Sequence, residues 1–195
     1  GGAKLCAIDV RLSNTASMSD YWLAPWPGTE AFLLLAFAQV ILSEKLYDAK
    51  FLEDWTNWRD YLRATRPDRA PTMELLLEEL TQHYAAYTPE AAEKECGVAK
   101  ETIVAVAREI GKAGSAFASH VWRNAASGNL GGWQVARCLQ FGSVLVGAVG
   151  TPGGTNLNVQ NKFVPPPFLK PPPQNVWSEL LFPPEWPLAH HELSY

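Results

Sequence analysis

The sequence is poor in cysteine, has no excess of basic residues and contains no long apolar run. Its three cysteines are widely spaced and form no CxxC pair. A zinc ribbon, a thioredoxin-type pair, a ferredoxin-type cluster and a disulfide framework are therefore not expected within the chain. Lys and Arg number 16 against 20 Asp and Glu, which argues against a nucleic-acid partner, since such proteins normally use a basic face. The longest apolar run, residues 31–42, is far shorter than the roughly 20 residues of a membrane span. The mild acidity fits the cytoplasm and the periplasm equally.

What the sequence does contain is enough apolar material for a core. Apolar residues make up 47% of the 195 residues, as in an ordinary globular protein. The chain opens with Gly1-Gly2, has no initiator Met, and reaches an apolar stretch at residues 5–10. Such a short run is typical of a buried strand in a parallel sheet, which needs neighbours on both sides. We therefore expect a segment of a larger protein; the alternative is a Gly-Gly extension on a complete domain.

Apolar patterning and capping residues predict alternating strands and helices. Thr29 before Glu30 is typical of a helix start, and so is Thr88 before Pro89. The predicted strands are residues 5–10 and 116–122, with a short extended piece at 21–24. The predicted helices are residues 30–45, 48–58, 73–84, 89–96, 100–110 and 133–149, with a loop at 59–72. This order predicts an α/β fold: part of a Rossmann-like open parallel sheet with crossover helices in three layers.

The composition changes after about residue 160, where nine of the 15 prolines lie. Proline fixes its own φ angle and has no amide donor, so long helices and central strands are not expected there. We assign residues 1–156 to an incomplete α/β segment and residues 157–195 to an extended, proline-rich C-terminal arm.

Three polar side chains follow the first predicted strand. Asp9 ends the strand, and open α/β sheets bind ligands beyond the carboxyl ends of their strands, where an acid can accept hydrogen bonds from ribose hydroxyls. Arg11 can bind a phosphate with its forked donors. Asn14 lies in a run of small polar residues that suits phosphates or a simple turn. Each also has an ordinary explanation, as a loop acid, a surface arginine and a turn residue.

Two further polar clusters lie at predicted strand-to-helix connections. Gly28, Thr29 and Glu30 precede a helix: the glycine lets a ligand approach the backbone, and the carboxylate can accept two hydrogen bonds from the N1–H and amino groups of guanine. An ordinary capped helix start is the alternative. Arg123 and Asn124 lie in a glycine-rich loop after the second predicted strand and can hydrogen-bond an anionic or heterocyclic ligand, or simply contact solvent.

Taken together, these stretches resemble the large subunit of the molybdopterin oxidoreductases, the dimethyl sulfoxide reductase and formate dehydrogenase superfamily. The likeness covers about residues 2–156 and depends on the order and spacing of four stretches. They are the strand ending in Asp9-Val10-Arg11, similar to the family's Asp-Pro-Arg; Pro27-Gly28-Thr29-Glu30, similar to its Pro-Gly-Thr-Asp; Tyr87-Thr88-Pro89-Glu90 with Gly97-Val98; and the glycine-rich run from Leu145 to Gly154.

The resemblance implies a role for each cluster. The parent protein would bind molybdopterin guanine dinucleotide with molybdenum or tungsten, and this segment would help to hold one guanosine diphosphate arm. Asp9 would match the family's ribose-binding acid, and Gly28, Thr29 and Glu30 its guanine-side element. Arg11 and Asn14 would lie near that arm or its phosphates. Arg123 and Asn124 would lie in a loop that faces the cofactor.

The sequence also departs from the family pattern. Val10 replaces the usual proline, Glu30 is one methylene longer than the usual Asp, and the loop at residues 119–132 differs from its commoner form. The resemblance implies that the metal's protein ligand and a 4Fe-4S cluster lie upstream of this segment, so the chain alone would have no redox activity. Its partners would be the remainder of the parent polypeptide and an electron-transfer iron-sulfur subunit.

Two other interpretations stay open. A small domain that binds NAD or another mononucleotide without catalysis would need a Gly-x-Gly-x-x-Gly turn between a strand and a helix, and none is visible. A protein-interaction domain would use the prolines and tryptophans of the tail as its interface.

Overall fold

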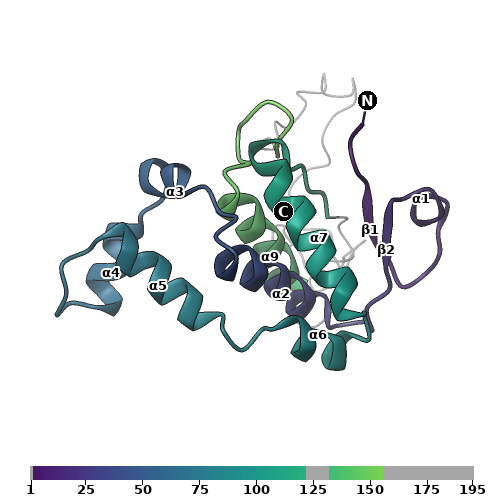
Figure 1. The fold of residues 1–195 in the computed structure, drawn as a ribbon, viewed down its shortest axis with the longest axis horizontal. Coiled ribbons are helices and arrows are strands. Elements are labelled where there is room, and N and C mark those ends of the chain that lie inside the picture. Colours follow the sequence, from purple (N-terminus) through teal and green to yellow (C-terminus); the bar gives the residue numbers. More distant parts are fainter. Residues whose placement is uncertain (1, 122–131, 156–195) are drawn as a thin grey trace, which may run out of the picture. The chain divides into compact units, whose positions relative to one another are not determined.

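The computed structural model describes residues 2–121 and 132–155, which belong to one compact unit, Gly1–Asn156. Two short strands and a larger set of helices make up this unit (Figure 1). In chain order the described elements are β1 (Cys6–Ile8), α1 (Asn14–Ser17), β2 (Tyr21–Leu23), α2 (Glu30–Ser43), α3 (Ala49–Trp55), α4 (Trp58–Thr65), α5 (Met73–His83), α6 (Pro89–Cys96), α7 (Lys100–Ala113), the 3₁₀ turn η1 (Gly114–Ala116) and α9 (Gly132–Leu145).

Strands β1 and β2 pair in parallel, with Ile8 opposite Leu23. The connection between them holds the single turn of α1 and is close to the shortest that can join parallel strands, about a dozen residues. One more hydrogen bond, from the Asp9 amide to the Leu23 carbonyl at 3.1 Å, continues the pairing past the end of β1. At the opposite end the Asp20 carboxylate accepts hydrogen bonds from the Lys4 ammonium and the Leu5 amide.

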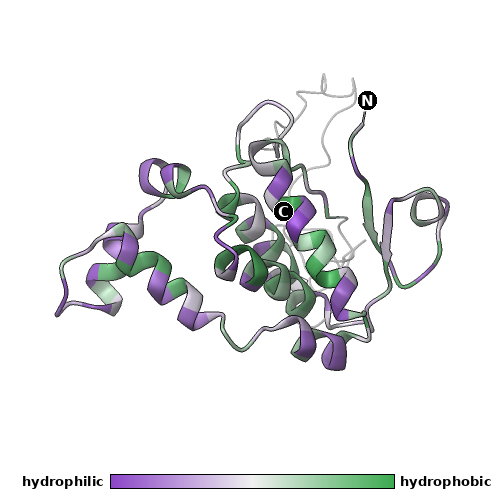
Figure 2. Ribbon diagram, in the orientation of Figure 1, coloured by the Kyte–Doolittle hydropathy of each residue, from purple (hydrophilic) through white to green (hydrophobic). Residues whose placement is uncertain are grey.

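Helix α2 is the centre of the core. Eight of its 14 residues are buried, and it packs against α5, α6, α7 and α9. Figure 2 shows hydrophobic residues along its length. Its first half shares a cluster with α7, through side chains such as Leu33 and Ile103. Its second half shares another with α9, through Ile41 and Leu145. A helix that is apolar on nearly all sides is stable only when it is surrounded.

Most of the predicted helices are confirmed. The predictions at residues 30–45, 48–58, 73–84, 89–96, 100–110 and 133–149 correspond to α2, α3, α5, α6, α7 and α9. The predicted loop at 59–72 is wrong in its first half, because α4 occupies Trp58–Thr65. Trp58 and Leu62, one helical turn apart, bury themselves against Leu75 and Leu76 of α5, and this burial stabilises a helix that has no capping side chain.

The predicted strand at residues 116–122 is not a strand over 116–121, and residue 122 lies outside the described residues. Instead η1 ends at Ala116, and the Ser119 amide donates to the hydroxyl of Thr155 at 3.1 Å rather than to a neighbouring strand. The partner of β1 is β2, which falls in the short extended piece expected at residues 21–24. The described fold is therefore mostly helical with a small parallel sheet, and α/β-like.

Two predictions about the architecture stay untested. The three-layer Rossmann-like sheet requires more strands than β1 and β2, which are the only ones that pair into a sheet among the described residues. The proline-rich arm at residues 157–195 lies outside the described residues. No helix in residues 2–121 and 132–155 combines the length and hydropathy of a membrane-crossing segment.

Candidate functional site

Asp9 lies at the carboxyl end of β1, where the sequence predicts it. Its backbone is held on both sides: the amide donates to Leu23, and the carbonyl accepts from the indole Nε1 of Trp22 at 2.8 Å. Its carboxylate Oδ1 accepts from the Arg11 amide at 3.0 Å. The residue is half-buried, so the carboxylate is fixed in position while one side stays open to solvent.

These contacts also fix the charge of Asp9. Hydrogen bonds from the Arg11 amide and the Ser13 hydroxyl lower the pKa of the Asp9 carboxyl below its ordinary value. An ionised carboxylate donates nothing and can accept up to about four hydrogen bonds. Asp9 is therefore suited to bind a group that presents hydroxyl donors, such as a ribose.

Arg11 and Asn14 flank Asp9 on the exposed connection to β2. Both side chains are exposed. Asn14 is the first residue of α1, whose N-cap, Ser13, accepts the Ala16 amide at 3.3 Å. The structure thus brings Asp9, Arg11 and Asn14 onto one short connection, as the sequence predicts, and leaves the Arg11 guanidinium exposed at the surface.

Gly28, Thr29 and Glu30 form a tight entry into α2. Gly28 has a φ of 90°, a conformation that favours glycine. Its amide donates to the Glu30 Oε2 at 2.9 Å, so the carboxylate folds back over the start of the helix. Thr29 stands at the N-cap position but does not cap with its side chain, which corrects the expectation. Its hydroxyl donates instead to the Trp26 carbonyl at 2.6 Å.

The C-terminal end of α6 contacts this loop through hydrogen bonds. The Trp26 amide donates to the Cys96 carbonyl at 3.0 Å, and the Cys96 thiol lies 3.5 Å from the Thr29 carbonyl. Gly97 ends α6 in the left-handed conformation, with a φ of 73°. A Cβ atom on Gly97 would lie 3.0 Å from the Trp26 Nε1, so the indole rests against the bare glycine. The sequence motif at 96–98 and the motif at 27–30 therefore meet in space.

The two polar clusters share one edge of the sheet. Asp9 directly follows β1, and the Gly28–Glu30 turn follows β2 after a short link. Since Ile8 and Leu23 are opposite each other in the parallel pair, both chains leave the sheet at its carboxyl end. This is the edge at which open α/β sheets bind ligands. Arg123 and Asn124, the third predicted cluster, lie outside the described residues.

The sequence reasoning missed the aromatic side chains at this edge. Trp22 and Trp26 are 42% and 61% exposed, although large aromatics usually bury most of their surface. The available signal was the Pro25-Trp26-Pro27 sequence, in which two fixed proline backbones hold a tryptophan between a strand and a helix.

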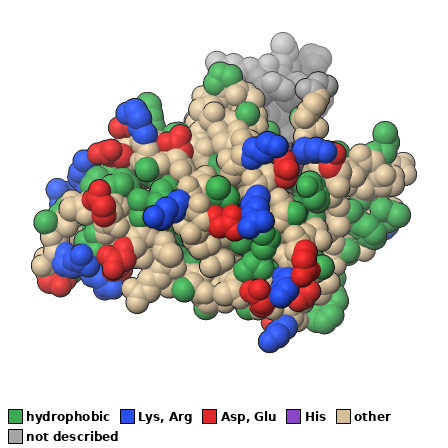
Figure 3. Space-filling view, viewed as in Figure 1, with side chains coloured by type: hydrophobic (Ala, Val, Ile, Leu, Met, Phe, Trp, Pro, Cys, Tyr) green, Lys and Arg blue, Asp and Glu red, His purple; other side chains and the backbone are tan. Residues whose placement is uncertain are grey.

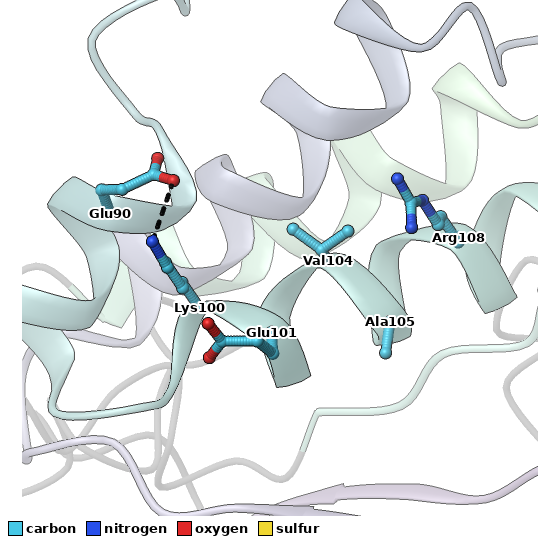
Figure 4. Close-up of a pocket in the computed structure, with 6 residues that line it drawn as sticks. All are labelled: Glu90, Lys100, Glu101, Val104, Ala105 and Arg108. Atoms are coloured by element: carbon cyan, nitrogen blue, oxygen red, sulfur yellow. Dashed lines mark ion pairs between the residues drawn. The ribbon is translucent and has the colours of Figure 1, made fainter.

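A surface hollow of about 290 Å³ lies elsewhere, on α6 and α7 (Figure 4). Lys100 and Glu90 form an ion pair of 3.6 Å at one end. At the other end Arg108 binds the Glu44 carboxylate through two hydrogen bonds of 2.8 and 2.9 Å. Between them lie Val104 and Ala105. Both cations of this hollow are thus paired with carboxylates, and none of the predicted site residues lines it.

No group of three or more His, Cys, Asp and Glu side chains in residues 2–121 and 132–155 could hold a metal ion. The three cysteines Cys6, Cys96 and Cys138 are free thiols. Burial raises the pKa of the Cys6 thiol to about 11, which keeps it protonated and unreactive at neutral pH. The described part of the chain therefore offers hydrogen-bonding groups for a ligand rather than ligands for a metal.

No family model matches the chain, but curated proteins do. It is 34% identical over 182 residues to the dimethyl sulfoxide reductase DmsA of Haemophilus influenzae, covering 87% of this chain and 21% of that protein. It is 31% identical to the molybdopterin-containing subunit of the arsenate respiratory reductase of a Shewanella species, over 62% of this chain and 14% of the relative. The alpha subunit of the F420-dependent formate dehydrogenase of Methanocaldococcus jannaschii is 36% identical, over 57% of this chain and 14% of the relative.

Solved structures show the same relationship at the level of the fold. Acetylene hydratase from Pelobacter acetylenicus superimposes with a TM-score of 0.57 and 24% identity, over 78% of this chain and 18% of that one. The chain thus spans about one fifth of the length of the first curated relatives that it matches.

Proposed function

We propose that this chain, which is homologous to a segment of the molybdopterin oxidoreductases, helps to hold one guanosine diphosphate arm of a molybdopterin guanine dinucleotide cofactor. The observation that supports this proposal most is the shared edge of the sheet. Both candidate carboxylates follow the carboxyl ends of paired strands. Asp9 comes directly after β1, and Glu30 lies in the Gly28–Glu30 turn that follows β2. Two acceptors on one edge match the donors of a ribose and a guanine.

The residues present fit such a ligand. Asp9 can accept hydrogen bonds from the two ribose hydroxyls. Glu30 uses Oε2 for the Gly28 amide, and no partner of its Oε1 is found among the residues that the structure describes, so this oxygen can accept from the guanine N1–H or amino group. At Gly28 a Cβ atom would meet nothing within 4 Å, so the space over the turn is open to a planar base.

The remaining site residues have supporting roles in the proposal. Arg11 and Asn14, both exposed beside Asp9, bind or screen the phosphates of the arm. Arg123 and Asn124, outside the described residues, contribute further donors from their loop. The cofactor, when bound, supplies two-electron redox chemistry at molybdenum or tungsten. The residues of this chain bind and orient its nucleotide end.

The proposal includes the rest of an oxidoreductase. Since the relatives are about five to seven times as long as the matched region, the metal's protein ligand, a 4Fe-4S cluster and the contact with an electron-transfer iron-sulfur subunit belong to other parts of the polypeptide. The segment itself is proposed to have no redox activity.

The test is Asp9→Ala in the intact polypeptide, purified anaerobically. Loss of the hydrogen bonds to the ribose is expected to cost about 1–3 kcal/mol, which corresponds to roughly 5- to 150-fold weaker retention of the cofactor. Molybdenum, tungsten and released guanine nucleotide are quantified before and after prolonged dialysis.

Asp20→Ala is the matched control, because Asp20 is an acid on the same small sheet but at its amino edge, where it holds Lys4 and Leu5. It is expected to retain the cofactor. Equal retention by Asp9→Ala and the parent would contradict the proposal. A parent protein with neither metal nor guanine nucleotide would favour the interpretation as a protein-interaction domain.

A further inference from the structure

Trp26 is a large aromatic side chain that stays 61% exposed in a loop that is otherwise tightly held. Its amide donates to the Cys96 carbonyl, and its carbonyl accepts from both the amide and the hydroxyl of Thr29. Every polar group of its backbone is thus satisfied inside the protein. A residue that leaves its backbone fixed and its indole exposed is pre-organised for contact with something outside the described structure.

The indole is also fixed in orientation. It rests against Gly97, where a Cβ atom would come within 3.0 to 3.4 Å of three atoms of the ring system. Gly97 can adopt its left-handed conformation without strain, and it leaves room that any other residue would fill. The indole therefore lies against Gly97 on one side, and most of its remaining surface is exposed.

The Glu30 carboxylate is held by the same loop that carries Trp26. It accepts from Gly28, two residues after Trp26. Burial is the main cause that raises the pKa of the Cys96 thiol, and the charge of Glu30 adds to it. The Cys96 carbonyl accepts a hydrogen bond from the Trp26 amide. A flat ring placed over the indole would therefore lie within the same small region as a carboxylate that can accept from its edge.

We propose that Trp26 stacks on the guanine base whose edge Glu30 binds; this inference rests on the function proposed above. The two residues recognise different properties of the base. The indole contacts the face of the ring, and every purine has such a face. The Oε1 oxygen of the carboxylate accepts from the N1–H or the 2-amino group of guanine, and adenine has neither of these donors. Affinity and base selectivity are thereby assigned to different side chains.

The experiment measures nucleotide binding to the intact polypeptide isolated without its cofactor. The probes are guanosine diphosphate and inosine diphosphate, which lacks the 2-amino group. Trp26→Ala is expected to weaken the binding of both nucleotides about tenfold, with their ratio unchanged, and to abolish most of the fluorescence quenching that the nucleotides cause. Trp26→Phe keeps a smaller ring and is expected to recover part of the affinity. Glu30→Gln is expected to reduce the preference for guanosine over inosine diphosphate.

Trp55→Ala is the matched control, since Trp55 is 77% exposed at the end of α3; it is expected to bind both nucleotides like the parent. If Glu30→Gln and Asp9→Ala weaken guanosine diphosphate but Trp26→Ala does not, the stacking role is wrong and the proposed function stands. If the parent binds neither nucleotide, or if Asp9→Ala and Glu30→Gln bind normally, the proposed function fails and the stacking role fails with it. Near-ultraviolet circular dichroism checks that each variant keeps the native fold. If Trp26→Ala loses the native fold, Trp26→Phe provides the test instead.

Discussion

Asp9 has its charged form stabilised by neighbouring groups of its own chain. The Arg11 amide and the Ser13 hydroxyl stabilise the charged carboxylate and lower its pKa below 3.8. Because the folded pKa is depressed, the stabilising contribution is present above the unfolded pKa and is lost as the pH falls through the folded value. The contribution is small, since the carboxylate is in contact with solvent.

The predicted outcome is a difference in pH dependence. Asp9→Asn is expected to unfold with a free energy that changes less steeply than that of the parent as the pH falls through the ordinary titration range of an aspartate, and to match its slope near neutral pH. Urea titrations at a series of pH values from acidic to neutral measure the slopes, and carbon-13 NMR of the carboxyl group measures the pKa directly. A carboxyl pKa of 3.8 or higher would rule out this role of the two donors.

Two features of Gly97 favour glycine at this position: its positive φ angle and the nearness of the Trp26 indole to the place that a Cβ atom would take. Its φ of 73° is strained for an L-residue, and a Cβ atom would come within 3.0 Å of the Trp26 indole, which would have to shift slightly. Gly97→Ala is therefore predicted to destabilise the protein by more than about 1 kcal/mol, measured by thermal or urea unfolding. Gly142→Ala is the comparison: it lies inside α9 with nothing within 4 Å of the new Cβ, and is expected to be neutral or slightly stabilising. Equal effects of the two changes would contradict the explanation.

At the scale of elements, caps determine where several helices begin. Thr88 accepts the Ala91 amide at 3.2 Å and stands before Pro89, the first residue of α6. Thr88→Ala is predicted to cost about 1 kcal/mol of unfolding free energy. Thr81→Ala, on an exposed position inside α5, is expected to cost much less because alanine is the better helix former. A loss in Thr81→Ala as large as in Thr88→Ala would show that the cap contributes nothing.

The same caps explain which elements the sequence could predict. Asp48, Thr72 and Thr88 each bind an amide in the first turn of their helices, and the helices that follow were placed within a few residues. Helix α4 was missed because Asn57 makes no such bond and the helix is stabilised by burial of Trp58 against α5, which lies beyond local sequence. The strand expected at residues 116–122 failed because a strand requires a neighbour, and local sequence does not identify one.

The candidate site was predictable to a similar degree. Asp9 and Glu30 could be selected as candidates because they end or follow elements with clear local patterns, and their role in binding stays a prediction. The contact of Trp26 with Gly97 joins residues about 70 positions apart in the sequence, so no local pattern contains it. The resemblance to a family indicated the motifs at residues 27–30 and 96–98, and the structure shows that these two segments lie in contact.

At the scale of the whole molecule, β1 and β2 form a small sheet with little apolar burial of its own. They form a two-stranded sheet, and large apolar side chains around it are exposed, including Val10 at 56%, Leu12 at 57% and Met18 at 84%. Figure 3 shows hydrophobic side chains on the side of α1, β1 and β2. Two strands alone are marginally stable in water.

Amide hydrogen exchange is therefore expected to distinguish the small sheet from the helical core. In the chain expressed by itself, the amides of β1 and β2 are predicted to exchange much faster than those of α2, whose apolar surface is surrounded by four helices. In the intact polypeptide the strand amides are expected to gain protection, as neighbouring elements cover them. Equal protection of β1 and α2 in the isolated chain would refute this view of its stability.

The position of α2 has a consequence for synthesis. Its apolar surface is covered partly by α9, which begins at Gly132, whereas α2 ends at Ser43. A ribosome that adds about 5–20 residues per second needs on the order of 10 s to make the chain between them. During that interval the most hydrophobic helix of the described fold has left the ribosome without one of its main packing partners, and it is the segment that a chaperone is expected to bind first.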